Sequence, residues 1–191
     1  MIASLLLGLT WGINEGTWFF IIPDIALSFF ALRGWKPALI GTIFTIIGAM
    51  VAAILLFAIF SLVPSSQEKI IQLWQSLPGF YPKMLEIAAT HLKERQGQGL
   101  LMGPNSGIPY RFYILEAYKQ GISLSHLLLW TPIARLERIA IAPIIVLILN
   151  FLLKKKFEEK KVKHFLGFFI FCYWIGIYIW YWGFFLPKTY Q

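Results

Sequence analysis

The sequence predicts an all-α integral membrane protein with two inverted re-entrant helical hairpins. Each hairpin is followed by a transmembrane helix, and the chain adds an amphipathic connector and a C-terminal transmembrane helix. The 191 residues are 58% hydrophobic and only 14% charged, whereas a soluble domain carries about 25% charged residues. Prolines and charges interrupt two of the apolar stretches, and six lysines crowd one short connection. We therefore expect residues 1–191 to form a single membrane domain.

The first half, residues 1–63, begins with an apolar stretch that contains two acidic residues, Glu15 and Asp24. A carboxylate at bilayer depth costs about 2.5 to 3.5 kcal/mol, so it usually faces a protein interior or a water-filled cavity. Pro23 precedes Asp24, and irregular backbone is tolerated in a membrane only inside protein or beside a cavity. Further interruptions are Gly12, Asn14 and Gly16. The stretch predicts two helical pieces with a turn at membrane depth.

The run from Ala38 to Val63 carries no charge and predicts a transmembrane helix. Gly41 and Gly48 lie two helical turns apart, and Ala52 follows four residues later. Such a stripe of small residues lets another helix approach closely. Ordinary membrane glycines would give the same pattern, so this observation leaves both interpretations open.

Residues 64–98 are more polar and predict an amphipathic connector, broken at Pro78 and Pro82, that lies in the membrane interface with Trp74 at head-group level. The second half, residues 99–153, then repeats the features of the first. Its candidate re-entrant loop tips, matching Pro23, are Pro104 and Pro109. Arg111 follows directly, and Arg135 and Arg138 lie in the apolar run after it.

The lysines of residues 154–163 predict a cytoplasmic loop, and residues 164–186 predict the closing transmembrane helix. If this loop lies in the cytoplasm, the span that precedes it crosses the membrane from the outer face to the cytoplasmic face. The Ala38 to Val63 span then runs outward, which places the basic turn at Arg33 and Lys36 in the cytoplasm as well. The two interrupted elements would enter the membrane from opposite faces. Paired interruptions of this kind are a sequence pointer to a transport site.

Two segments resemble the DedA family, which carries the VTT or SNARE-associated-type domain, and in particular its YqaA-like branch. They are EGTWFFIIPDIALSFFALRGWKPALIGTIFTIIGAMVAA and GPNSGIPYRFYILEAYKQGISLSHLLLWTPIARLERI. In the first, Asp24 corresponds to the acidic residue after the loop proline, and in the second Arg135 and Arg138 resemble the family's arginine pair. The resemblance implies a lipid-handling or transport role, with membrane lipids as partners and a bacterial-type plasma membrane as the location.

A mechanism follows if the two loop tips meet inside the membrane. An Asp24–Arg111 ion pair would offset part of the desolvation cost of both charges. Arg111, Arg135 or Arg138 could bind a lipid phosphate, since a guanidinium donates two parallel hydrogen bonds. Asp24 or Glu15 could exchange a proton, which makes protons the candidate coupling ion. The same charges would also serve as purely structural locks between half-helices.

Other classes of function find little support. The sequence lacks HExxH, GxSxG, CxxC and P-loop patterns, so we expect neither an enzyme nor a cofactor. His91, His126 and His164 are dispersed and Cys172 is alone, which disfavours a metal site. The net charge of +8 is concentrated beside a span and does not indicate nucleic acid. The alternative is a non-transporting assembly factor or small subunit that binds a partner through its small-residue stripe. Homo-oligomerisation stays open.

Overall fold

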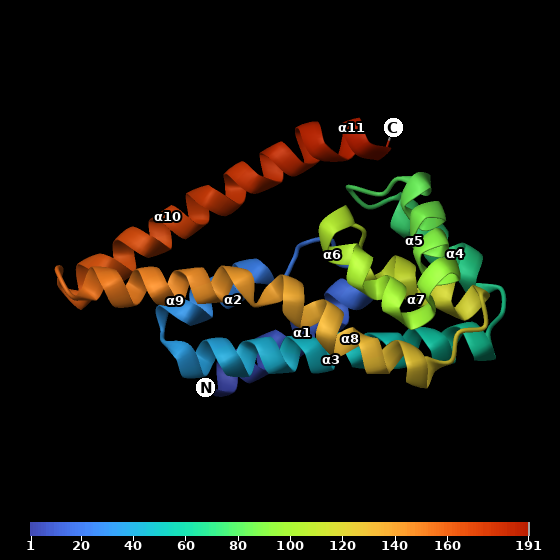
Figure 1. The fold of residues 1–191 in the computed structure, drawn as a ribbon, viewed down its shortest axis with the longest axis horizontal. Coiled ribbons are helices and arrows are strands. Elements are labelled where there is room, and N and C mark those ends of the chain that lie inside the picture. Colours follow the sequence, from blue (N-terminus) through green and yellow to red (C-terminus); the bar gives the residue numbers. More distant parts are fainter. Residues whose placement is uncertain (191) are drawn as a thin grey trace.

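Helices make up every regular element of residues 1–190, the part of the chain that the computed structural model describes, the side chain of Asn105 excepted. Three helical segments are long and apolar enough to cross a membrane. The elements are α1 Ile2–Thr17, α2 Asp24–Leu32, α3 Trp35–Leu62, α4 Ser66–Gln75, α5 Pro82–Arg95, the 3-10 helix η1 Gln96–Met102, α6 Gly103–Ser106, α7 Tyr110–Lys119, α8 Leu124–Ile139, α9 Ile141–Lys154, α10 Glu159–Trp180, the π-helix η2 Tyr181–Phe185 and α11 Leu186–Tyr190 (Figure 1).

The candidate spans are Trp35–Leu62, Leu124–Lys154 and Glu159–Tyr190. The second comprises α8 and α9, which join at Ala140. Pro143 explains this joint, because proline has no N–H to donate to the carbonyl four residues earlier, here that of Ile139. The prediction of an all-helical membrane protein is confirmed at this level, with spans close to the predicted ranges.

Helix α1 packs along α3 through small residues on both helices. A Cβ atom on Gly8 would lie 2.6 Å from the carbonyl oxygen of Gly41, and one on Gly16 would lie 2.5 Å from the Cβ of Ala52. The backbones therefore approach as closely as a small-residue motif allows. Since Gly8 faces Gly41 and Gly16 faces Ala52, the two helices run parallel.

This packing corrects the interpretation of the first stretch. Gly12, Asn14 and Gly16 do not interrupt the helix, because α1 is continuous from Ile2 to Thr17. Its glycines repeat every four residues, on the face against α3, so they serve the contact between helices. The stripe on α3 is thus already covered by α1, and a partner subunit could not use that stripe without displacing α1.

The chain breaks instead at residues 18–23, called here the first break, where the helical hydrogen-bonding pattern stops between α1 and α2. Pro23 caps the start of α2, a place where its missing N–H costs little. Helix α2 then runs back along α3, with Phe30 and Leu27 against Gly41. The turn into α3 uses Gly34 at φ +123, a conformation that residues with a Cβ rarely adopt.

Helix α3 and the α8–α9 segment are antiparallel (Figure 1). At one end Tyr118, in the last turn of α7 and close to the start of α8, contacts Phe57 and Phe60 of α3. At the other end the side-chain amide of Asn150 in α9 donates to the carbonyl of Leu32, just before α3, at 3.3 Å. The second break, residues 107–109, separates α6 from α7.

The connector forms α4 and α5, as the sequence predicts, but its tryptophan lies elsewhere. Trp74 is completely buried, and its Nε1 donates to the carbonyl of Thr17 at the end of α1, at 2.7 Å. The prediction of an interfacial Trp74 is therefore wrong. The last carbonyls of α1 have no helical partner, and this indole satisfies one of them, so the connector packs inward.

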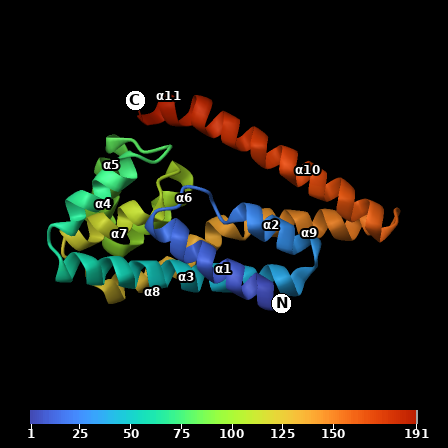
Figure 2. The same cartoon turned by 180° about the vertical axis from the view of Figure 1, so that it is seen from behind.

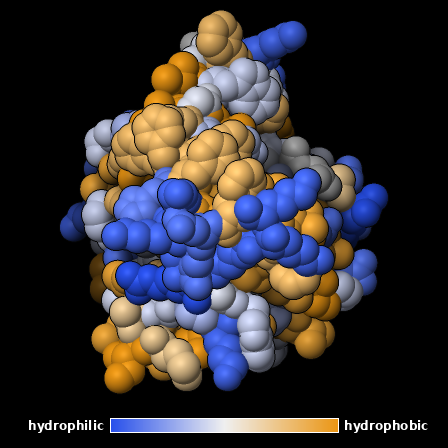
Figure 3. Space-filling model, turned by 90° about the vertical axis from the view of Figure 1, so that its left-hand side faces the viewer, coloured by the Kyte–Doolittle hydropathy of each residue, from blue (hydrophilic) through white to orange (hydrophobic). Residues whose placement is uncertain are grey.

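Helix α10 leaves the bundle at a shallow angle from α9 and its continuation, α11, reaches the region of α5 and α6 (Figures 1 and 2). Along its middle, α10 packs on α2 and α9 through Leu166, Ile170 and Trp174. The turn between α9 and α10 lies at the same end as Arg33. Hydrophilic side chains gather across this end of the molecule (Figure 3). We call it the basic end, and its cations are Arg33, Lys36 and the lysines of residues 154–163.

Candidate functional site

A buried ion pair between Glu15 and Arg135 lies at the centre of the molecule. The carboxylate is on the last turn of α1 and the guanidinium is on α8, and each side chain is only 4% exposed. Arg135 Nη1 donates to Glu15 Oε1 at 3.1 Å, and Nη2 donates to Oε2. Two parallel hydrogen bonds fix both the distance and the orientation of the groups. The pair joins the first half of the chain to the second.

The predicted Asp24–Arg111 pair does not form. Arg111 Nη1 donates to the carbonyl of Phe19 in the first break, at 3.0 Å, and the guanidinium lies 5.9 Å from the ring of Trp74 and 5.1 Å from that of Phe112. The physical reason is the break itself, which leaves a backbone carbonyl without a helical donor. Arg111 supplies that donor, so the two interrupted elements are joined through backbone and not through two charged side chains.

Asp24 opens α2 and is buried, with 5% of the residue exposed. Its Oδ2 has no hydrogen-bond partner among the described residues. A carboxylate at a helix N-terminus is favoured by the partial positive charge there, which offsets some of the cost of burial. Ser28, one turn later, donates to the backbone carbonyl of Asp24 at 2.7 Å, and not to the carboxylate.

Arg138 lies one turn after Arg135 on α8 and is half-buried. Within the described part of the chain its guanidinium forms no ion pair. Glu137, which precedes it, is exposed on another face of the helix. Arg138 contributes to the walls of several cavities.

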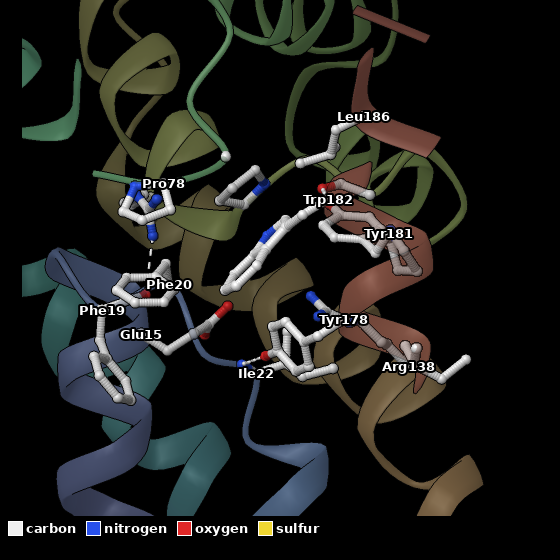
Figure 4. Close-up of a pocket in the computed structure, with 16 residues that line it drawn as sticks. Glu15, Phe19, Phe20, Ile22, Pro78, Arg138, Tyr178, Tyr181, Trp182 and Leu186 are labelled. Carbon is white, nitrogen blue, oxygen red and sulfur yellow. Dashed lines mark hydrogen bonds between the residues drawn. The ribbon is translucent and has the colours of Figure 1, made fainter. Parts of the chain in front are cut away.

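A polar cavity of about 190 Å³ lies between the two breaks and the C-terminal helix. Its charged wall is formed by Glu15, Arg111 and Arg138, and Pro104 and Pro109 also line it, whereas Pro23 does not. Figure 4 shows Glu15 and Trp182 pointing into the same space, with Tyr178 across from them. The remaining lining residues come from the first break, the α4–α5 turn, the second break and α10–α11: Phe19, Phe20, Ile22, Pro78, Gly79, Gly107, Ile177, Tyr178, Tyr181, Trp182 and Leu186.

Two tyrosines connect the C-terminal helix to both breaks. The backbone N–H of Ile22 donates to the hydroxyl of Tyr178 at 2.9 Å, and the hydroxyl of Tyr181 donates to the carbonyl of Gly107 at 2.8 Å. From the sequence alone this region predicts only the closing transmembrane helix, and neither tyrosine is among the candidate site residues. The available signal was a tyrosine pair at i and i+3, which lies on one face of a helix.

A second cavity of about 390 Å³ lies between α2, α9 and α10, and Arg138 belongs to its wall as well. Asp24 and Ser28 are at its polar end, and we call it the apolar groove because its other walls are aliphatic and aromatic. These are Ile141, Ala142, Ile145, Val146, Leu149, Leu166, Phe169, Ile170, Tyr173 and Trp174.

Four of the five charged residues selected from the sequence thus line two adjoining cavities, namely Glu15, Asp24, Arg111 and Arg138, and the fifth, Arg135, is paired with Glu15. Three guanidinium groups meet two carboxylates, which leaves one positive charge in excess when all are ionised. Within residues 1–190 no group of three histidine, cysteine, aspartate or glutamate side chains is arranged to hold a metal ion. Comparison of the chain with protein families, characterised proteins and solved structures gave no match.

Proposed function

We propose that this protein moves an anionic small molecule or lipid across a membrane through the polar cavity between the two interrupted helical elements. The observation that carries the proposal is Arg138, a half-buried guanidinium without an ion-pair partner in the described structure, placed where two cavities adjoin. A charge at membrane depth is expensive and usually marks a ligand or ion pathway. A purely structural lock would pair this arginine, as Glu15 pairs Arg135.

The re-entrant arrangement is part of the proposal, and the helix directions support it. Helix α1 starts level with the start of α3, since Gly8 faces Gly41, and ends near Ala52, well before α3 ends at Leu62. Helix α2 then returns to the level where α3 begins. A path that enters a membrane, turns inside it and comes back has this form.

The second half has a related geometry. Tyr110 at the start of α7 is hydrogen-bonded to Thr131 in the middle of α8, at 2.6 Å, and α7 ends at Lys119 close to the start of α8. Helix α7 therefore runs back along the helix that follows it, as α2 does along α3. The antiparallel directions of α3 and α8–α9 support the proposal that the two halves form an inverted repeat. The DedA resemblance agrees with this arrangement.

We further propose a multi-pass protein of a bacterial-type plasma membrane with the basic end in the cytoplasm, following the positive-inside rule. Protons are the candidate coupling ion, since Asp24 has a buried carboxylate oxygen without a hydrogen-bond partner at the edge of the apolar groove.

Transport by the purified protein tests the proposal. Vesicles with a fluorescent anionic lipid in both leaflets are treated with a membrane-impermeant quencher, and the fraction of lipid that becomes quenched reports exchange between leaflets. We expect exchange above that of protein-free vesicles. Arg138→Gln, Asp24→Asn and Arg111→Ala should abolish it while the proteins still insert.

Lys155→Gln is the matched control, because Lys155 is an exposed cation of the basic end and should not affect the cavity. Wild-type rates from all three site variants, or no exchange by the unmodified protein for any anionic lipid or solute tested, would contradict the proposed function.

A further inference from the structure

We propose that the segment Tyr181–Tyr190, which comprises η2 and α11, is a lid that closes the polar cavity and pivots where α10 passes into η2. The part of α10 up to Tyr178 is called here the base. The inference rests on the proposed function, because it concerns how the same cavity is opened and closed. Its physical basis is the packing of the C-terminal helix on two separate hydrophobic clusters.

The C-terminal helix changes its packing partners where η2 begins. The base, up to Tyr178, packs on the cluster that it shares with α2 and α9. From Tyr181 onward, the inward side chains pack instead on the cluster formed by the connector, α7 and part of α3. Ile179 and Trp180, which lie between, are 64% and 52% exposed. The base and the lid are therefore held by different parts of the molecule, and the stretch that joins them is not packed.

The joint coincides with an irregularity of the helix. Residues Tyr181–Phe185 form a π-helix, and such single turns mark kinks in α-helices and are frequent at functional sites. None of the five residues is buried, and a Cβ on Gly183 would meet nothing within 4 Å. The π-helical turn thus has open space around it, and a bend there would disturb little packing.

Two tyrosine hydroxyls of the lid donate to backbone carbonyls at the second break. Tyr181 donates to the carbonyl of Gly107 at 2.8 Å, and Tyr190 donates to that of Ser106. Gly107 caps α6 at φ +71, and a Cβ there would lie 3.0 Å from the Tyr181 hydroxyl. Within residues 1–190 these are the side-chain hydrogen bonds that join the lid to other elements, and we call them the latch.

The lid forms one wall of the polar cavity, to which it contributes Tyr181, Trp182 and Leu186 (Figure 4). The ring of Trp182 lies 5.5 Å from that of Phe20 in the first break. Its Nε1 would lie 3.3 Å from a Cβ on Gly79, in the α4–α5 turn. The lid therefore bridges the first break and the connector. Since α11 lies away from the basic end (Figure 1), its release would open the cavity toward the opposite face.

The size of the closed cavity requires one wall to move. Its volume of about 190 Å³ is below the ~300 to 1,000 Å³ of typical ligand pockets. The first break is an unsuitable moving part, because Trp11, Trp74 and Arg111 donate to carbonyls in it or at its edge. The Glu15–Arg135 pair likewise fixes α1 against α8. The lid, held across the cavity by the latch, is the wall that can move with the fewest hydrogen bonds broken.

The reaction rate of a thiol inside the cavity tests the lid. In a Cys172→Ser background, Ile177→Cys places one thiol in the cavity wall, on the base. The full chain in detergent is treated with sulfonatoethyl methanethiosulfonate, a charged reagent. We expect slow modification with the latch intact. Tyr181→Phe and Tyr190→Phe should each accelerate it about fivefold, the effect of one net hydrogen bond on an opening equilibrium, and the double variant about 25-fold.

Two controls separate lid opening from general loosening. Tyr118→Phe removes the hydroxyl of a half-buried tyrosine that does not line the cavity and should leave the rate at Ile177→Cys unchanged. Ser65→Cys, at an exposed position, should react rapidly and at the same rate with or without the latch. The lid is refuted if the double variant leaves the Ile177→Cys rate unchanged, or if it accelerates both thiols equally. It is also refuted if Ile177→Cys reacts as fast as Ser65→Cys with the latch intact.

The result is separable from that of the proposed function, because modification of the thiol needs no transported solute. Accelerated modification in the latch variants of a protein that exchanges no lipid would support the lid and contradict transport. Lipid exchange that requires Arg138, with a thiol rate that does not depend on the latch, would overturn the lid and leave transport standing.

Discussion

Arg135 donates to both carboxylate oxygens of Glu15, a residue 120 positions earlier in the chain. This contact joins α1 to α8 and thereby the first interrupted element to the segment that follows the second. Both side chains are 4% exposed, so neither charge has water to replace its partner. The geometry of the polar cavity depends on this pair, because Glu15 belongs to the cavity wall and Arg138 lies one turn beyond Arg135.

Removing one member of this pair should destabilise the protein strongly. Glu15→Gln or Arg135→Gln leaves an uncompensated buried charge, with an expected cost of about 3 to 5 kcal/mol. The double variant should recover part of that loss, since no net charge stays buried. Thermal unfolding in detergent measures all three. Lys163→Gln, which removes one partner of the exposed Lys163–Glu159 pair, is the control and should change nothing measurable. Strictly additive effects would show that the two groups are not coupled.

Small residues on α1 should be required for its packing on α3. A Cβ on Gly8 would meet the Gly41 carbonyl oxygen at 2.6 Å, so Gly8→Val should separate the helices and lower the unfolding temperature by several degrees. Gly176→Val is the matched control, because a Cβ there meets nothing within 4 Å. Limited proteolysis should then cleave the Gly8 variant faster than the control. Equal cleavage rates would contradict the packing.

The hydroxyl groups of Tyr178 and Tyr181 should stabilise the position of the C-terminal helix over the breaks. Tyr178→Phe with Tyr181→Phe removes two hydrogen bonds to the breaks, each worth about 1 kcal/mol, without changing the rings. Lipid exchange should change at least twofold in either direction while the protein stays folded. Tyr118→Phe, at a half-buried tyrosine of α7 that lines neither cavity, is the control, and an effect of equal size there would refute the idea.

The antiparallel directions of α3 and the α8–α9 segment predict which positions share a face of the membrane. With Cys172→Ser as the background, single cysteines at Arg33 and Lys155 should react with an impermeant reagent from one face. Cysteines at Ser65 and Gln120, near the far ends of α3 and α7, should react from the other. Labelling of Arg33→Cys and Lys155→Cys from opposite faces would exclude the proposed topology.

The sequence by itself determined the class of this protein. Uncharged runs long enough to span a bilayer require helices there, because a backbone in hydrocarbon must satisfy its own hydrogen bonds. It also selected the charged residues that share the cavities, since a charge among apolar residues is costly wherever it lies. The prolines marked the places where new helices begin after a break, as at Pro23 and Pro109.

Only the tertiary structure decided which groups the charged side chains contact. Glu15 and not Asp24 forms the ion pair, and Arg111 binds the Phe19 carbonyl, because these choices depend on helix rotation and on where carbonyls become free. The glycines of α1 appeared to interrupt a helix, yet they permit a close contact with α3 that no local pattern reveals. Trp74 shows the same limit, since an indole suited to a membrane interface is equally suited to a buried acceptor such as the Thr17 carbonyl.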